Sequence, residues 1–194
     1  MKRHDEAKVD KRKRAISIFI ALIMILSALG VYLGNSSTSI NYKEIKFNIL
    51  EDNRYSTKIN KNTFIFDYSP YVVETIAINS DIIQRIKNSV QVDFTSDPQS
   101  EFKESIALSQ FEIAKVLSLD NIFARTGFIS KNDYNLPIIT CDNSTASIPV
   151  VLFMKSNETK VYNQDYCIIV SASSNPDMVA LKDRIIYGYL GVIE

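Results

Sequence analysis

The stretch from residue 15 to residue 34 restricts this chain more than any other part of its sequence. Its twenty residues, AISIFIALIMILSALGVYLG, carry no charge, and a helix of about 20 residues spans the ~30 Å hydrocarbon core of a bilayer. The four residues before it, 11–14, are all basic, which by the positive-inside rule keeps the N-terminal tail in the cytoplasm. We therefore expect a cytoplasmic basic tail (1–14), a transmembrane helix (15–34) and an extracytoplasmic remainder.

Two other interpretations of this stretch are open. The small residues Ala28 and Gly30 behind an apolar core also suit a cleavable secretory signal, although the apolar run continues to Leu33. Such a signal would still export the rest of the chain. The run Arg14-Ala15-Ile16-Ser17 is similar to the cleavage site of archaeal prepilin leaders, but the Glu that usually follows in the apolar run is missing.

The distribution of charge argues against binding to nucleic acids. The chain has 22 basic and 22 acidic residues, of which residues 1–14 hold seven bases and three acids. The part that follows residue 34 therefore has 15 bases and 19 acids, a net charge of −4. Because a nucleic-acid surface needs clustered Lys and Arg, we expect no nucleic-acid partner.

The single histidine limits the chemistry available outside the membrane. His4 precedes the apolar stretch, so the external part has no Ser-His-Asp or Cys-His nucleophilic system and no zinc or iron site with a His ligand. The GxGxxG and GxxxxGK[ST] motifs of phosphate-binding loops are also absent. We expect no cofactor and no metal, and carboxylate chemistry or a Ser-Lys pair is what remains for catalysis.

The two cysteines agree with export. Cys141 and Cys167 both follow the apolar stretch, and an even pair in an oxidising compartment predicts a disulfide. Closing a loop of 26 residues would add about 3.5 kcal/mol of stability on the chain-entropy model. The alternative is a pair of buried reduced thiols, whereas two Cys without a CxxC spacing offer too few ligands for zinc.

The pattern of apolar residues after the span predicts one mixed α+β domain over 42–194, preceded by a polar linker (35–41). Two main helices are expected, one capped by Asp97 and one that begins at Asn175-Pro176. Antiparallel hairpins are expected among the strands. The other expected elements are a short helix over 81–87, strands over 42–49, 55–59, 63–68, 90–94, 122–129, 149–154 and 166–172, and polar loops over 131–147 and 157–165.

Two groups of charged residues are candidates for a site. Asp93, Asp97 and Glu101 form the closest acidic cluster. Since Asp97 and Glu101 are explained as a helix N-cap and a first-turn acid, we expect no catalysis there. The triplet Lys182-Asp183-Arg184 is expected to form a solvated face of the last helix, with Lys182 and Asp183 directed outward.

Three sequons for N-glycosylation lie outside the membrane in this interpretation. They begin at Asn35, Asn143 and Asn157, and the last two fall in expected loops. Their number is close to chance for this content of Asn, Ser and Thr, so modification at these positions is an expectation from local sequence only.

Six segments carry a resemblance to other proteins. They are the basic tail with its apolar stretch, Thr63–Pro70, Leu136–Asp142, Lys155–Lys160, Tyr166–Val170 and Asp183–Gly191. These segments resemble a group of uncharacterised archaeal single-span membrane proteins with an extracytoplasmic α+β domain. The resemblance covers nearly the whole chain. Because that group has no assigned activity, it implies an architecture and an envelope location, and it transfers no functional residue.

These observations favour a membrane-anchored extracytoplasmic domain that acts by binding or assembly in the cell envelope, without catalysis. The expected partners are the lipid bilayer, through residues 15–34, and an envelope protein. An accessory subunit of a larger membrane, secretion or pilus-like complex is the alternative. A carboxylate-dependent enzyme comes third.

Overall fold

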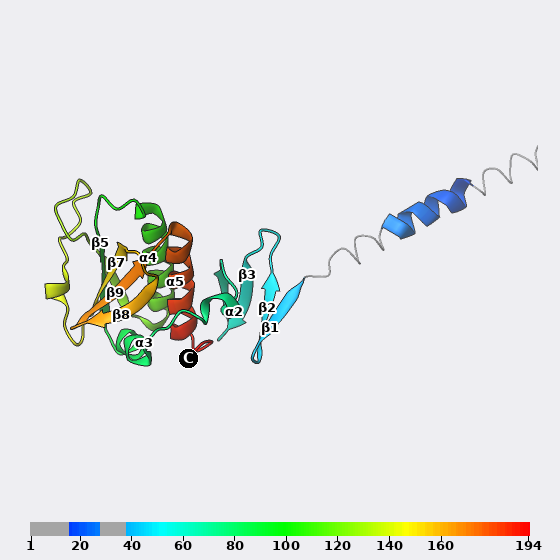
Figure 1. Ribbon diagram of the computed structural model, residues 1–194. Helices are drawn as coiled ribbons and strands as arrows, with labels where there is room; N and C mark the ends of the chain where they lie inside the picture. The colour runs from blue at the N-terminus through cyan, green and yellow to red at the C-terminus, as the bar shows by residue number, and fades with distance from the viewer. Residues whose placement is uncertain (1–15, 28–37) are drawn as a thin grey trace, which may run out of the picture. The chain divides into compact units, whose positions relative to one another are not determined.

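The computed structural model describes residues 16–27 and 38–194 (Figure 1). Residues 16–27 form a helix, and residues 39–194 belong to one compact unit. Among the described residues, no helix combines the length and the apolar character needed to cross a membrane. The tail, residues 35–37 of the linker, and residues 15 and 28–34 of the expected span lie outside the described residues, so the transmembrane helix stays a prediction.

The compact unit begins with a four-stranded antiparallel sheet in the order β1-β2-β3-β4. Its strands are β1 (Ser39–Tyr42), β2 (Ile45–Ile49), β3 (Tyr55–Ile59) and β4 (Asn62–Phe66). The β3–β4 hairpin is confirmed, and positive φ angles at Asn60 and Lys61 give it the tight turn typical of two-residue hairpins. Phe66 is buried while Ile65 is exposed, so successive residues of β4 face the core and the solvent in turn.

The prediction of one strand over 42–49 is wrong. The chain reverses between β1 and β2, with Lys43 at a φ of 51°, so the segment contributes to two strands instead of one. The alternation of apolar and polar residues continues through the turn, which hides the break. Residues 39–41, which the sequence assigned to the linker, pair with β2 as part of β1.

The second sheet has five strands in the order β6-β5-β7-β9-β8. They are β5 (Gln91–Ser96), β6 (Phe123–Thr126), β7 (Val150–Lys155), β8 (Lys160–Gln164) and β9 (Cys167–Ala172). The neighbouring strands pair in parallel except for the antiparallel edge strand β8. The prediction that 157–165 is only a loop is wrong, because this segment contains β8, whose exposed and polar residues give a weak strand pattern.

The helices of the compact unit are α2 (Pro70–Val73), α3 (Ser80–Lys87), α4 (Lys103–Leu117) and α5 (Asn175–Tyr189), with short 3-10 turns η1 (Ser118–Asp120) and η2 (Cys141–Asn143). Helix α5 lies between the two sheets (Figure 1), and all its residues from Ala180 to Tyr189 are buried. Toward the first sheet, the Tyr187 ring stacks on Phe66 at a centroid distance of 3.9 Å. Toward the second sheet, Ile185 lies among Val151 and Ile168.

The start of α4 differs from the prediction. Asp97 does not cap this helix, which begins only at Lys103. The Asp97 carboxylate instead accepts a hydrogen bond from the Gln99 amide at 2.8 Å, so it stabilises a turn, as Asp does outside helices. Farther along α4, Ser109 Oγ lies 3.4 Å from the Met178 carbonyl of α5 and donates to it, and the small serine side chain lets the two helices approach.

The long connection from β6 to β7 covers the face of the second sheet that the helices leave open. Ile139 packs there with Val150 and Ile169, and Thr95 Oγ1 donates to the Ile139 carbonyl at 2.7 Å. The connection approaches its own backbone closely at Gly127, where a Cβ atom would lie 2.5 Å from the Pro137 carbonyl oxygen. A glycine is therefore needed at this point.

A disulfide between Cys141 and Cys167 ties this connection to β9, as predicted. The two Cα atoms are 5.2 Å apart, within the range that a disulfide spans without backbone movement. Cys167 is buried against Ile139 and Val150, and it is the first residue of β9. The disulfide therefore fastens the connection to the sheet at the start of β9.

We expect the double variant Cys141→Ala/Cys167→Ala to lower the free energy of unfolding by about 3.5 kcal/mol, because it restores the freedom of a 26-residue loop to the unfolded chain. Urea denaturation of the full chain in detergent micelles, followed by circular dichroism, measures the change. Wild type treated with a reductant should match the variant. A loss below about 1 kcal/mol would show that the unfolded state is not restricted by this bond.

Candidate functional site

The charged triplet of α5 is buried, which corrects the prediction of a solvated face. The side chains of Lys182 and Asp183 have no exposed surface, and Arg184 is 3% exposed. The expectation assumed that α5 has one apolar face, whereas it lies between two sheets. The apolar residues Leu181, Ile185 and Ile186 flank the triplet on both sides, which is a sign of burial all round a helix.

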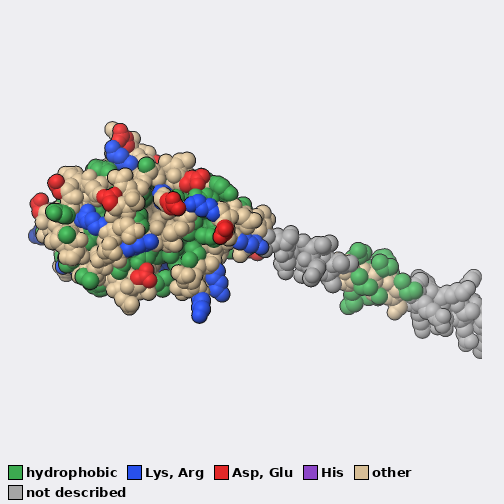
Figure 2. Space-filling model, turned by 90° about the horizontal axis from the view of Figure 1, so that it is seen from below, with side chains coloured by type: hydrophobic (Ala, Val, Ile, Leu, Met, Phe, Trp, Pro, Cys, Tyr) green, Lys and Arg blue, Asp and Glu red, His purple; other side chains and the backbone are tan. Residues whose placement is uncertain are grey.

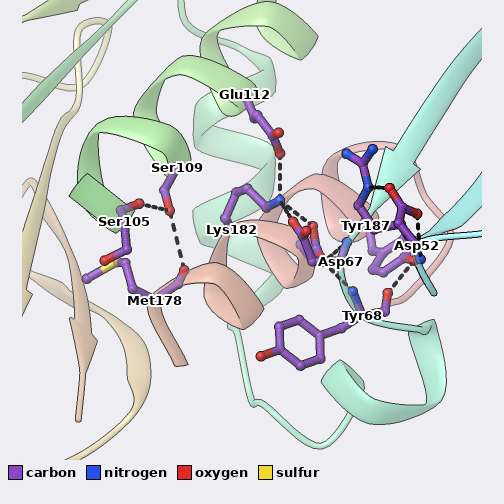
Figure 3. Close-up of polar contacts among 11 residues, drawn as sticks. Asp52, Asp67, Tyr68, Ser105, Ser109, Glu112, Met178, Lys182 and Tyr187 are labelled. Carbon is purple, nitrogen blue, oxygen red and sulfur yellow. Dashed lines mark hydrogen bonds and ion pairs between the residues drawn. The ribbon is translucent and has the colours of Figure 1, made fainter. Parts of the chain in front are cut away.

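Lys182 is the centre of an ion-pair cluster that joins three elements (Figure 3). Its Nζ lies 2.5 Å from Asp67 after β4, 2.5 Å from Glu112 on α4, and 3.0 Å from Asp183 Oδ1. The other oxygen of Asp183 accepts hydrogen bonds from the amides of Asp67 and Tyr68, both at 2.8 Å. The cluster therefore fixes the end of the first sheet to α4 and α5.

Three carboxylates around one ammonium make this cluster bind protons tightly. Burial opposes the charge on Lys182, but the charge of Asp183 and hydrogen bonds to Asp67 and Glu112 outweigh it and raise the pKa of Lys182. Burial raises the pKa of Asp183 to about 7, against the effect of the Lys182 charge. Both directions mean that the folded cluster holds protons that the unfolded chain would release.

The same geometry argues that the cluster is structural. Carboxylate oxygens of Asp67, Glu112 and Asp183 lie within 4.8 Å of one another, as ligands of a hard cation would. The Lys182 ammonium lies among them at ion-pair distance from all three. It supplies the positive charge that a bound cation would supply, so these residues hold the fold together and are not a candidate metal centre.

Arg184 has a related structural role. Its guanidinium donates to the Ile76 carbonyl at 2.9 Å and to the Glu194 carbonyl at 2.8 Å. These bonds fasten the segment between α2 and α3, and the residues after α5, to the centre of the domain. Burial lowers the pKa of Arg184, which still leaves a guanidinium charged at any physiological pH.

The better candidate for a functional site lies at the carboxyl ends of the parallel strands. The chain leaves β5 toward β6 and leaves β7 toward the opposite edge of the sheet. Neighbouring strands whose connections diverge leave a crevice outside their carboxyl ends, where α/β proteins commonly bind ligands. Two pockets lie there, and residues of the turn over 97–102 line both of them.

The first pocket, of about 360 Å³, is the polar one. We call it the charged pocket, and it is lined by Asp97, Gln99, Ser100, Glu101, Ile129, Leu152, Phe153, Met154 and Lys155. Asp97 and Glu101, two of the three acids that the sequence singled out, line its wall. The exposed Glu101 pairs with Lys155 at 2.5 Å, and this hydrogen bond lowers the pKa of Glu101. A general acid needs the opposite shift.

Asp93, the third acid of that group, is not part of the pocket. It is buried at 1% exposure and accepts hydrogen bonds from Arg125 on β6 and from Gln91. The hydrogen bond with Asp93 raises the pKa of Arg125. The structure therefore brings Asp97 and Glu101 together and places Asp93 in a cross-strand ion pair that joins β5 to β6.

The second pocket, of about 510 Å³, is mainly apolar. We call it the apolar pocket, and it is lined by Ser96, Pro98, Lys103, Glu104, Ile106, Ala107, Gln110, Thr126, Phe128, Tyr134 and Leu136. Its volume and its apolar walls with a few polar groups are typical of small-molecule sites. The sequence did not predict this pocket, although Gln110 interrupts the apolar stripe of α4 four residues after Ile106 and three before Ile113.

The outer wall of the apolar pocket is ordered by one asparagine. Asn132 Oδ1 accepts hydrogen bonds from the amides of Tyr134 and Leu136, and its Nδ2 donates to the Leu136 carbonyl at 2.9 Å. The Tyr134 ring lies 5.6 Å from that of Phe128. This wall belongs to the connection that the disulfide fastens to β9.

Two of the three sequons lie in the described part of the chain. Asn143 ends η2 and Asn157 precedes β8, and both are exposed. Asn35 lies outside the described residues. Their glycosylation stays a prediction.

Comparison with known proteins identified no relative of this chain. No family model matches the chain, no curated protein matches it, and no solved structure matches its fold.

We expect Lys182→Met to lower the free energy of unfolding by about 3–5 kcal/mol, because three carboxylates would lose their buried counterion. Lys155→Met is the matched control, since it removes an exposed ion pair that contributes at most about 1 kcal/mol. Urea denaturation of the full chain in micelles measures both. Equal effects for the two variants would contradict the assigned role of Lys182.

The raised pKa of Asp183 predicts a pH dependence. Because its folded-state pKa of about 7 exceeds the ordinary value of 3.8, the folded chain binds more protons between these values, and stability falls as pH rises through this window. From pH 5 to pH 8 we expect a loss on the order of 2 kcal/mol. Asp183→Asn should flatten this slope, whereas Asp133→Asn, at an exposed loop position, should keep it. Parallel slopes for Asp183→Asn and wild type would count against the prediction.

Proposed function

We propose that this chain is a membrane-anchored extracytoplasmic domain that binds a ligand in the cell envelope without catalysing a reaction. Residues 15–34 anchor it in the lipid bilayer, and residues 1–14 stay in the cytoplasm. The ligand binds at the carboxyl ends of β5, β6 and β7.

The observation that carries the proposed location is the disulfide. Cys141 and Cys167 are bonded, and such bonds persist in oxidising compartments. The uncharged stretch with four basic residues before it supplies the anchor and the orientation. On the face shown in Figure 2, acidic and basic side chains are interspersed, which agrees with the expectation of no nucleic-acid partner.

The two pockets support a binding role over a catalytic one. The disulfide consumes both thiols, and the external sequence has no histidine. Of the carboxylates that line the charged pocket, Glu101 is held as an anion by Lys155, and Asp97 is bonded to the turn. These groups hold the pocket in shape. A carboxylate-dependent enzyme is accordingly the third choice.

An accessory subunit of a larger membrane complex is the second candidate. The observation in its favour is a groove of about 310 Å³ between β4 and α4, with exposed Ile65, Phe111 and Leu119 in its walls. Among the strands that the structure describes, β4 is also an edge strand that pairs only with β3. A photoreactive phenylalanine analogue in place of Phe111 should crosslink one defined membrane protein in native membranes. Crosslinks to lipid alone would speak against this function.

Cysteine labelling in intact cells tests the proposed location. We expect Lys58→Cys, at an exposed position of β3, to react with a membrane-impermeant maleimide, because the domain lies outside. Lys8→Cys, in the N-terminal tail, should react only after the cells are permeabilised. The native cysteines do not react with the maleimide, because both are bonded in the disulfide and neither is a free thiol.

The reverse labelling pattern would place the domain in the cytoplasm and would contradict the proposed location. If both positions react only after permeabilisation, the chain does not cross the membrane and the anchor is wrong. Recovery of the Lys58→Cys protein without its tail would instead support a cleaved signal.

A further inference from the structure

The apolar pocket contains a side chain whose hydrogen-bonding capacity is not used within residues 38–194. Gln110 lines the pocket and is 7% exposed. Its Nε2 is buried and has no hydrogen-bond partner there. A buried N–H group without an acceptor destabilises the protein. A ligand group that accepts a hydrogen bond from Gln110 therefore contributes more binding free energy than the same hydrogen bond would at a solvated donor.

The remaining walls indicate the shape of that ligand. Phe128 and Tyr134 present two aromatic rings 5.6 Å apart, and Ile106 and Leu136 add aliphatic surface. Flat apolar groups pack well against such rings. The volume of about 510 Å³ accommodates a molecule larger than one ring.

The charges in the pocket indicate that the ligand is neutral. Its lining includes one cation, Lys103, and one anion, Glu104, which are adjacent in the sequence at the start of α4. Their charges cancel, so the lining has no net charge with which to select an ionised ligand. Specificity then depends on hydrogen bonds, and a carboxamide offers both a donor and an acceptor to a glutamine side chain.

We propose that the apolar pocket binds a small neutral molecule with a flat apolar body and a carboxamide group, which pairs with the side-chain amide of Gln110. This proposal rests on the binding role proposed above and names the ligand class for it. Phe128, Tyr134 and Leu136 enclose the apolar body. Asn132 is a positioning residue, since its hydrogen bonds hold the turn that carries Tyr134 and Leu136.

Three probes of similar size test the ligand class on the full chain in lipid nanodiscs. Benzamide has the ring and the carboxamide, toluene has the ring alone, and benzoate has a charge in place of the amide. Methyl NMR of Ile106, whose side chain lines the pocket, reports the dissociation constant of each probe. We expect benzamide to bind most tightly of the three.

Gln110→Leu isolates the contribution of the amide. We expect it to weaken benzamide binding by roughly tenfold and to leave toluene binding unchanged, because only benzamide loses hydrogen bonds. The matched control Gln164→Leu changes an exposed glutamine of β8 that lines neither the charged pocket nor the apolar pocket and should affect neither probe. Gln110→Leu should also raise the midpoint of thermal unfolding by roughly 2–4 °C, since it removes an unpaired buried donor.

The outcomes separate the ligand class from the binding role. If Gln110→Leu leaves benzamide affinity unchanged, or if toluene or benzoate binds wild type as tightly as benzamide, the proposed ligand class is wrong although the pocket still binds. If no probe shifts the Ile106 methyl signal at millimolar concentration, the apolar pocket is not a binding site and this proposal fails, whereas the binding role at this edge of the sheet would then depend on the charged pocket.

Discussion

The ammonium of Lys182 holds together parts of the domain that no strand pairing connects. It lies at ion-pair distance from Asp67 after the first sheet and from Glu112 on α4. Its neighbour Asp183 accepts two backbone amides at the point where the chain leaves β4. A buried charge of this kind contributes little net stability compared with apolar packing, but it is strongly destabilising when one partner is absent. The cluster therefore makes the relative position of the two sheets specific.

This arrangement explains which parts of the fold could be predicted from sequence. The β3–β4 hairpin, β7, β9 and the start of α5 depend on local patterns, and each was predicted within about two residues of its observed bounds. The first turn, β8 and the start of α4 were not predicted. Apolar and polar residues alternate through the turn at Lys43, β8 is mostly polar, and an Asp such as Asp97 suits a turn as well as a helix cap. The burial of Lys182 and Asp183 was missed for a different reason, since only the packing of α5 between two sheets determines it.

The candidate site, like the fold, could be predicted only in part. Asp97 and Glu101 were visible as an acidic pair, and the structure places both in the charged pocket. The apolar pocket depends on the connection between β6 and β7, whose path follows from Gly127, Asn132 and the bond between Cys141 and Cys167. Of the residues that line the apolar pocket, only Gln110 was visible in the sequence, because it is a polar residue among the buried apolar residues of α4. The disulfide thus has two effects, because it restricts the unfolded chain and fastens the outer wall of the pocket.

The position of α5 has a consequence for biosynthesis. This helix follows every other element of the domain in the sequence, yet it supplies the surface on which both sheets bury their inner faces. Nascent strands emerging from the ribosome consequently lack their central support until residues 175–189 have also been made. The domain therefore completes its fold only after α5 has been made, and an exported polypeptide of this design would stay unfolded, and able to thread through a secretion channel, until α5 has been delivered.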